Sequence, residues 1–97
     1  MNVGIAPEHL EKIRRIFRSY PQIEQVILFG SRAKGTHREG SDVDLALKGK
    51  ALDSRLLTRI ALDYDALYLP WKLDVILYDT IENPDLKDHV DRVGVPL

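Results

Sequence analysis

Hydrophobic and polar residues follow a helical period in three parts of the chain. Apolar side chains recur every three or four positions over residues 7–20, which predicts an amphipathic helix that starts at its proline. A wider apolar stripe with the same spacing covers residues 53–69, where the first aspartate is placed to cap the helix. A last helix is predicted over residues 84–93, between an asparagine cap and a closing glycine.

Three further segments have the apolar or alternating pattern of strands. Residues 23–29 are apolar and β-branched, which is typical of a buried strand. Residues 42–48 alternate strictly, so Asp42 and Asp44 share one face of the predicted strand while its valine and leucines share the other. Residues 71–78 alternate in the same way and place a third aspartate on the polar side.

These elements predict an α/β fold of the α+β type, in the order helix, strand, helical turn, strand, helix, strand, helix. Ser31 is expected to cap the short helical turn, which runs to Lys34. Residues 30–41 join the first two strands and are about as short as a parallel crossover allows, so we expect an antiparallel pair. A full helix joins the second and third strands, which favours a parallel pair. The expected architecture is a small mixed sheet with helices packed mainly on one face.

Length and composition narrow the classes of protein. The chain has 97 residues, which suits a single domain spanning residues 1–97. Its 14 basic and 15 acidic residues leave a net charge of −1, so we do not expect direct binding to nucleic acid. The absence of cysteine excludes disulfides, thiolate catalysis and most structural zinc sites. No apolar run approaches the roughly 18 residues of a membrane span, and we expect a cytoplasmic protein.

The predicted topology gathers three carboxylates and a glycine-serine turn in one patch. Antiparallel pairing sets Gly30 and Ser31 beside Asp42, and parallel pairing sets Asp74 beside the same strand end. Carboxylates this close repel one another, and a hard cation such as Mg²⁺ relieves the repulsion. Two such ions can clamp the attacking and leaving oxygens of a phosphoryl displacement. We therefore expect Asp42, Asp44 and Asp74 to be catalytic metal ligands, although a one-residue shift of the third strand would turn Asp74 into the core.

The glycine-serine turn offers the donors that a triphosphate needs. Gly30 permits a close approach of the backbone, and the first amides of the following turn are unpaired. Ser31 can donate its hydroxyl to a phosphate oxygen, and Arg32 and Lys34 add positive charge, although both are equally consistent with a soluble turn. A P-loop is not favoured, because Thr36 stands where that motif requires a lysine.

The chain contains a glycine-serine pair, then ten residues, then Asp-any-Asp, with a further aspartate downstream. In this pattern it resembles the minimal nucleotidyltransferases of the DNA polymerase β-like superfamily. The resemblance covers nearly the whole chain. It implies transfer of a nucleoside monophosphate, expected to be AMP from ATP, with two magnesium ions and with pyrophosphate as the leaving group. It also implies that Gly30 and Ser31 bind the triphosphate and that Asp42, Asp44 and Asp74 bind the metal ions.

The same resemblance implies a partner protein. Minimal nucleotidyltransferases are often paired with a small helical HEPN protein in toxin–antitoxin systems, and in some pairs the nucleotidyltransferase is the antitoxin and adenylylates the toxin. We therefore expect an antitoxin that acts on a HEPN-type partner, within a homo- or hetero-oligomer whose composition the pattern does not define. The candidate contact residues are Tyr64, Tyr68, Trp71, Val93, Val95 and Leu97.

Other functions stay open at this stage. The chain is also consistent with a non-catalytic antitoxin or nucleotide-binding subunit that neutralises or assists a helical partner without turnover. A third possibility is nucleotidyl transfer to RNA or to a small molecule. In the plainest alternative, Asp42 and Asp44 are two ordinary aspartates on a solvated strand face. The pattern does not define the nucleotide base, the acceptor, or whether the domain is active alone.

Several further polar residues are interpreted as surface groups. Asp63 and Asp65 repeat the Asp-any-Asp pattern, but they lie on a predicted helix, where residues two apart face different directions. His37 lies in the loop above the expected site, while His9 and His89 have no neighbours in the sequence that resemble a ligand set. His37 is interpreted as solvated.

Overall fold

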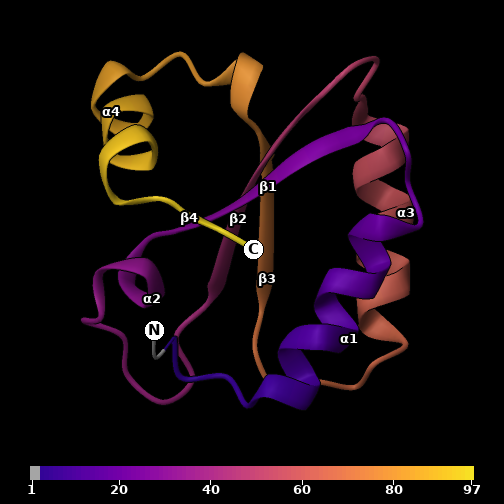
Figure 1. The fold of residues 1–97 in the computed structure, drawn as a ribbon, viewed down its shortest axis with the longest axis vertical. Coiled ribbons are helices and arrows are strands. Elements are labelled where there is room, and N and C mark those ends of the chain that lie inside the picture. The colour runs from indigo at the N-terminus through magenta and orange to yellow at the C-terminus, as the bar shows by residue number, and fades with distance from the viewer. Residues whose placement is uncertain (1–2) are drawn as a thin grey trace.

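The computed structural model describes residues 3–97, and its elements follow the predicted order with two additions (Figure 1). The elements are α1 (Pro7–Arg18), β1 (Ile23–Phe29), α2 (Ser31–Lys34), β2 (Val43–Gly49), α3 (Ser54–Asp65), β3 (Leu73–Leu77), η1 (Tyr78–Thr80), α4 (Pro84–Val93) and β4 (Val95–Pro96). The additions are η1, a single turn of 3₁₀ helix, and the short strand β4. Among the residues described, no helix is long and apolar enough to cross a membrane.

The predicted capping residues explain where the helices begin. Asp53 precedes α3, and its carboxylate accepts a hydrogen bond from the amide of Leu56 at 3.0 Å. Asn83 has the same role for α4 and accepts from the amide of Asp85 at 2.9 Å. α1 starts at Pro7, which has no amide hydrogen to leave unpaired.

α3 is shorter than predicted, because it ends at Asp65 rather than at residue 69. The amide of Tyr68 donates to the carbonyl of Asp65 at 3.2 Å, and Tyr68 then adopts a left-handed backbone conformation with a φ of 52°. This conformation cannot continue a right-handed helix. Tyr68 is therefore 92% exposed instead of joining the apolar stripe.

The sheet has the predicted mixture of antiparallel and parallel pairs. Its strand order is β3-β2-β1-β4. β1 and β2 are antiparallel, with Phe29 opposite Asp44, while β2 and β3 are parallel, with Asp44 beside Asp74. β4 pairs with the other edge of β1 and sets Val95 opposite Leu28. Asp44 therefore lies on an inner strand, between the end of β1 and the start of β3.

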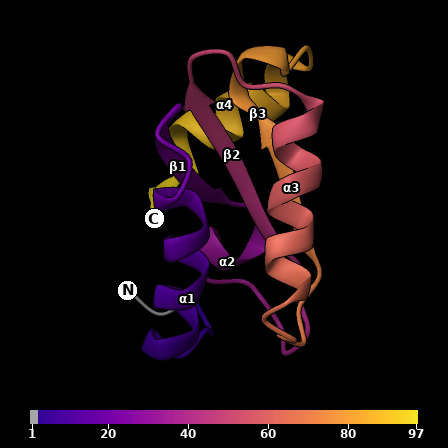
Figure 2. The same cartoon turned by 90° about the vertical axis from the view of Figure 1, so that its right-hand side faces the viewer.

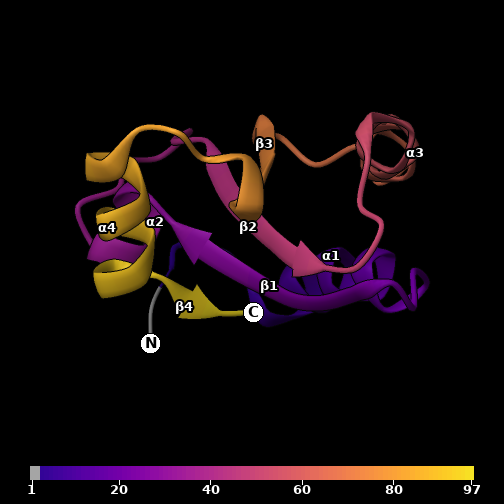
Figure 3. The same ribbon diagram turned by 90° about the horizontal axis from the view of Figure 1, so that it is seen from above.

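Helices cover both faces of the sheet, α1 and α3 on one face and α4 on part of the other (Figure 2, Figure 3). The prediction that the helices lie mainly on one face holds for α1 and α3 but not for α4. The second face of β1 and β2 is itself apolar at its centre, and α4 buries it. The larger core includes Ile13, Phe17, Leu28, Leu45, Leu47 and Ile60. The smaller core consists of Ile27, Phe29, Ala46 and Val90.

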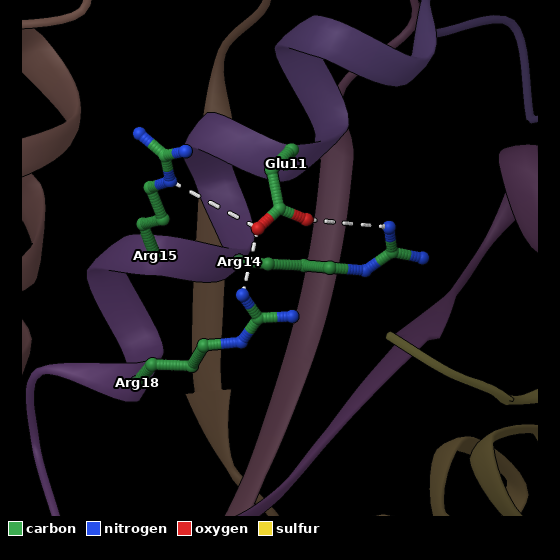
Figure 4. Close-up of polar contacts among 4 residues, drawn as sticks. All are labelled: Glu11, Arg14, Arg15 and Arg18. Atoms are coloured by element: carbon green, nitrogen blue, oxygen red, sulfur yellow. Dashed lines mark hydrogen bonds and ion pairs between the residues drawn. The ribbon is translucent and has the colours of Figure 1, made fainter.

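The exposed side of α1 carries a basic cluster around one carboxylate (Figure 4). Glu11 lies 2.7 Å from a guanidinium nitrogen of Arg18, 3.9 Å from one of Arg15 and 4.0 Å from one of Arg14. Solvent-exposed ion pairs of this kind contribute about 0–1 kcal/mol each to stability. Because α1 packs on the larger core, this positive charge lies on the opposite side of the sheet from the face that carries Asp44.

Candidate active site

The glycine-serine turn forms where β1 ends and α2 begins. Gly30 occupies the N-cap position of α2 with a φ of 76°, and Ser31 is the first helical residue. The prediction that Ser31 caps this turn is therefore wrong by one position. A capping residue has a non-helical backbone, and glycine adopts positive φ without the steric cost of a Cβ atom.

A second reason for glycine at position 30 is its contact with Asp44. A Cβ atom built on Gly30 would collide with the Oδ2 atom of the Asp44 carboxylate. This contact follows from the register, since Phe29 pairs with Asp44 and Gly30 is the next residue. The absence of a side chain at Gly30 thus lets a carboxylate of β2 lie against the end of β1.

The three predicted carboxylates lie at neighbouring positions of the sheet. Asp44 is half-buried on β2, and Asp74 is exposed on β3 directly beside it. Asp42 is exposed and immediately precedes β2, which starts at Val43 and not at residue 42 as predicted. The alternative in which a register shift turns Asp74 into the core is excluded.

Electrostatics connects the three groups. Burial raises the pKa of Asp44 above its ordinary value, and the negative charges of Asp74 and then Asp42 raise it further. The positive charge of Arg32 partly offsets these effects. Asp42 and Asp74 therefore act on Asp44 through their charges, which is the repulsion that a bound cation would relieve.

The donor set fits a hard divalent cation, because it consists of carboxylate oxygens, which Mg²⁺ prefers. As the side chains are arranged, however, no three His, Asp or Glu residues between 3 and 97 stand close enough together to hold a metal ion. The carboxylates that raise the pKa of Asp44 would have to turn toward a shared ion to complete its coordination shell.

Arg32, which was expected to contact the triphosphate, donates its hydrogen bonds to backbone carbonyls of this chain. Its side chain is 2% exposed, and its Nη1 donates to the carbonyl of Val3 at 2.7 Å. Its Nε and Nη2 donate to the carbonyl of Ser41 at 3.1 and 2.8 Å, and the guanidinium lies over the ring of Trp71. Burial lowers the pKa of Arg32. Arg32 thus ties the start of the chain to the loop before β2, whereas Lys34, at the end of α2, is exposed.

His89 is a contact of the turn that the sequence reasoning missed. Its Nε2 accepts a hydrogen bond from the amide of Gly30 at 3.0 Å, and its ring packs edge-on against Phe29 with centroids 6.1 Å apart. The neighbours of His89 in the sequence do not predict this contact. The apolar residues on the second face of β1 and β2 were the available signal, because they require a covering helix, and α4 is that helix.

The residues considered for partner contact do not form one surface. Tyr64 is buried and donates to the carbonyl of Trp71 at 2.7 Å. Tyr68 and Trp71 line a groove of about 610 Å³ between α3 and the start of β3, which Asp74 also lines. Val93, Val95 and Leu97 are half-buried beside β1 at the opposite edge of the sheet.

Two other interpretations can be compared with the structure. Asp63 and Asp65 are both exposed on α3, as predicted, and the Asp63 carboxylate accepts a hydrogen bond from the hydroxyl of Tyr20. His37 is half-buried and not fully solvated, and its Nδ1 is buried with no hydrogen-bond partner among the described residues.

Comparison with known proteins places this arrangement in context. The sequence profile of the family described as "Polymerase beta, Nucleotidyltransferase" matches residues 11–97. The chain is 34% identical to the "Putative protein adenylyltransferase MJ0141" of Methanocaldococcus jannaschii, over 96% of this chain and 95% of the relative.

Solved structures share the fold. A structure described as a putative minimal nucleotidyltransferase is 26% identical, with a TM-score of 0.75, and the match covers 100% of this chain and 97% of the other. A chain of the complex described as tri-AMPylated Shewanella oneidensis HEPN toxin with MNT antitoxin is 22% identical, with a TM-score of 0.64, over 89% of this chain and 66% of the other.

Proposed function

Because the chain belongs to the polymerase beta nucleotidyltransferase family, we propose that it transfers AMP from ATP to a protein acceptor in a magnesium-dependent reaction. The observation that carries the proposal is the sheet register, which sets Asp44 beside Asp74 on one side and beside the end of β1 on the other. A relative that shares a third of its residues over almost the whole chain is described as a protein adenylyltransferase, which supports ATP and a protein acceptor.

In this proposal the carboxylates of Asp42, Asp44 and Asp74 hold two magnesium ions. When bound, these ions neutralise the triphosphate and make the attacking hydroxyl more acidic. Burial and then the negative charges of Asp74 and Asp42 raise the pKa of Asp44. The charge contribution supports the assignment, because clustered carboxylates attract a cation. Each carboxylate then contributes ligand oxygens and orients the reacting groups.

The triphosphate lies along the turn after β1. The hydroxyl of Ser31 and the backbone amides that follow it donate to phosphate oxygens, and the exposed Lys34 adds charge. Gly30 brings this turn against Asp44, so the phosphates and the carboxylates share one volume. Arg32 has a supporting role here, since its donors are occupied by the carbonyls of Val3 and Ser41.

The reaction itself is a single displacement. An acceptor hydroxyl oxygen forms a bond to the α-phosphorus of ATP, and the bond from that phosphorus to the oxygen bridging to the β-phosphate breaks. The hydroxyl loses its proton, AMP becomes esterified to the acceptor, and pyrophosphate leaves. The part of this chain is to bind, orient and neutralise, because the transferred group needs no covalent intermediate on the protein.

The proposed acceptor is a HEPN-type helical protein, with this chain as the antitoxin. The description of the similar complex as an AMPylated HEPN toxin with an MNT antitoxin supports that choice. The exposed Tyr68 and the groove beside it provide an uncovered surface next to β3. In the alternative, the chain neutralises the partner by binding alone, for which the same groove would suffice.

Labelled transfer separates these two functions. The chain is incubated with a HEPN-type helical protein, with [α-³²P]ATP and with MgCl₂, and label on that protein is measured. Transfer is expected with the wild type and is expected to be lost in Asp42→Asn and Asp44→Asn. Asp79→Asn is the matched control, because Asp79 is an exposed aspartate beyond the opposite end of β3 from Asp74. Equal labelling by all four proteins would reject the proposed catalytic role.

A further inference from the structure

His89 connects α4 to the turn at which the proposed reaction takes place. It lies one residue before Val90, whose side chain is buried in the smaller core, so its backbone is held on the sheet. Its ring contacts two adjacent residues, Phe29 at the end of β1 and Gly30 at the start of α2. The side chain therefore contacts the chain at the point where a strand becomes a turn.

The hydrogen bond fixes the chemical state of the ring. An amide N–H only donates, so the Nε2 atom of His89 must present its lone pair to Gly30. The ring is then neutral, and its proton is on Nδ1. Free histidine can adopt either tautomer, so the bond selects one of them.

The same bond occupies the amide of Gly30. This amide is therefore not a donor to the triphosphate, and the hydroxyl of Ser31 and the amides after it are left for that purpose. Gly30 is thus held by His89 through its nitrogen while its Cα lies against the carboxylate of Asp44. A shift of Gly30 would move the phosphate-binding turn relative to Asp44.

We propose that His89 is a positioning residue for nucleotide binding, which sets the Gly30–Ser31 turn at its working distance from Asp44. The inference rests on the proposed function, because the turn is assigned there to the triphosphate. Without the acceptor at Nε2, the amide of Gly30 loses its partner and the turn is free to reorient. Removing one such hydrogen bond is expected to weaken nucleotide binding about three- to tenfold.

Two substitutions separate the hydrogen bond from the packing of the ring. His89→Phe keeps an aromatic ring against Phe29 and removes the acceptor, whereas His89→Gln keeps an acceptor at the end of the side chain and removes the ring. His9→Phe is the matched control, because His9 packs edge-on against Trp71 and not against Phe29 or Gly30.

The first measurement is the dissociation constant of AMP-PNP in the presence of MgCl₂, by calorimetry on the full chain. We expect His89→Phe to bind about three- to tenfold more weakly, and His89→Gln and His9→Phe to stay within about twofold of the wild type. Unchanged binding by His89→Phe, or weakened binding by His89→Gln alone, would overturn the positioning role. Equal weakening of both would also overturn it, because binding would then not depend on whether residue 89 provides an acceptor.

The second measurement is independent of nucleotide. The ¹⁵N chemical shifts of the His89 ring report its tautomer, and the proton shift of the Gly30 amide reports the hydrogen bond. We expect an unprotonated Nε2 in the wild type, and an upfield shift of the Gly30 amide proton in His89→Phe but not in His9→Phe. A protonated Nε2 would overturn the inference whether or not the chain is an enzyme. Conversely, a wild type that shows the hydrogen bond but binds no AMP-PNP would contradict the proposed function, and with it the role of His89 in nucleotide binding.

Discussion

The two faces of the sheet differ in what they contribute. The face under α1 and α3 carries a continuous apolar core, including Leu45, which is fully buried. The face under α4 carries a small core around Ala46. The preceding residue of β2 on that face is the half-buried Asp44. Adjacent residues of β2 thus lie on different faces, Leu45 in the stabilising core and Asp44 on the charged face. The core under α1 and α3 holds the strand that carries Asp44 in place.

Asp44→Asn should have the largest effect of all on activity. Loss of a carboxylate that would hold the metal ions is expected to slow labelled transfer about a thousandfold or more, which corresponds to about 4 kcal/mol of the barrier. The same substitution should not lower the free energy of unfolding at neutral pH.

The pKa of Asp44 is raised in the folded chain from its ordinary value of 3.8. Asp44 therefore contributes stability below pH 3.8, and this contribution is lost as the pH rises through the raised pKa.

The check on this sign is thermal unfolding of wild type and Asp44→Asn between pH 4 and pH 8, without divalent ions. The variant should be at least as stable as the wild type at neutral pH, and the difference should shrink as the pH falls. A variant that is less stable than the wild type at every pH would contradict the view that ionised Asp44 destabilises the folded chain.

Leu45→Ala tests the other face of the same strand. Removal of a buried leucine side chain is expected to lower the free energy of unfolding by about 2–5 kcal/mol, measured by urea denaturation. The affinity of the folded fraction for AMP-PNP with MgCl₂ should stay unchanged, because Leu45 points away from Asp44. Weakened nucleotide binding at full folding would show that the two faces are not separate.

Gly30→Ala changes the turn at the end of β1, where the backbone contacts the carboxylate of Asp44. Alanine there combines a positive φ with a collision between Cβ and the carboxylate of Asp44, and about 1–3 kcal/mol of stability should be lost. Gly35→Ala is the matched control, since Gly35 has a φ of 77° and nothing within 4 Å of the added Cβ. Both variants should be destabilised in urea, but only Gly30→Ala should also weaken binding of AMP-PNP. Equal binding by the two would remove the contact with Asp44 from the site.

Tyr68→Gly should have the smallest effect, and in the stabilising direction. Tyr68 is 92% exposed and has a left-handed backbone, so glycine removes strain at little cost in packing. The free energy of unfolding should rise by about 0.5–1 kcal/mol, and AMP-PNP affinity should not change. A loss of stability would show that the exposed ring packs on the groove beside β3.

The sequence predicted the sheet and the acidic patch well, because both depend on local patterns. β1 has the predicted bounds, and alternation in β2 separates its aspartates from its leucines. Connection lengths then fix the pairing that sets Asp44 beside Asp74. A long apolar stripe, in contrast, does not reveal the backbone turn at Tyr68 that ends α3 early.

The support of the site could not be predicted, because it depends on contacts between distant segments. α4 crosses to the acidic face to cover Ile27 and Ala46, and only this crossing brings His89 to Gly30. Arg32 resembles a solvated loop residue, but backbone carbonyls far from it in the sequence bury it. Such partners leave no periodic signal.

The central claim is that three carboxylates together hold two divalent ions beside the triphosphate. Electron paramagnetic resonance of Mn²⁺ in the presence of AMP-PNP counts the ions bound per chain. The account predicts two for the wild type and for Asp79→Asn, and fewer for Asp74→Asn. The same number for wild type and Asp74→Asn would contradict it.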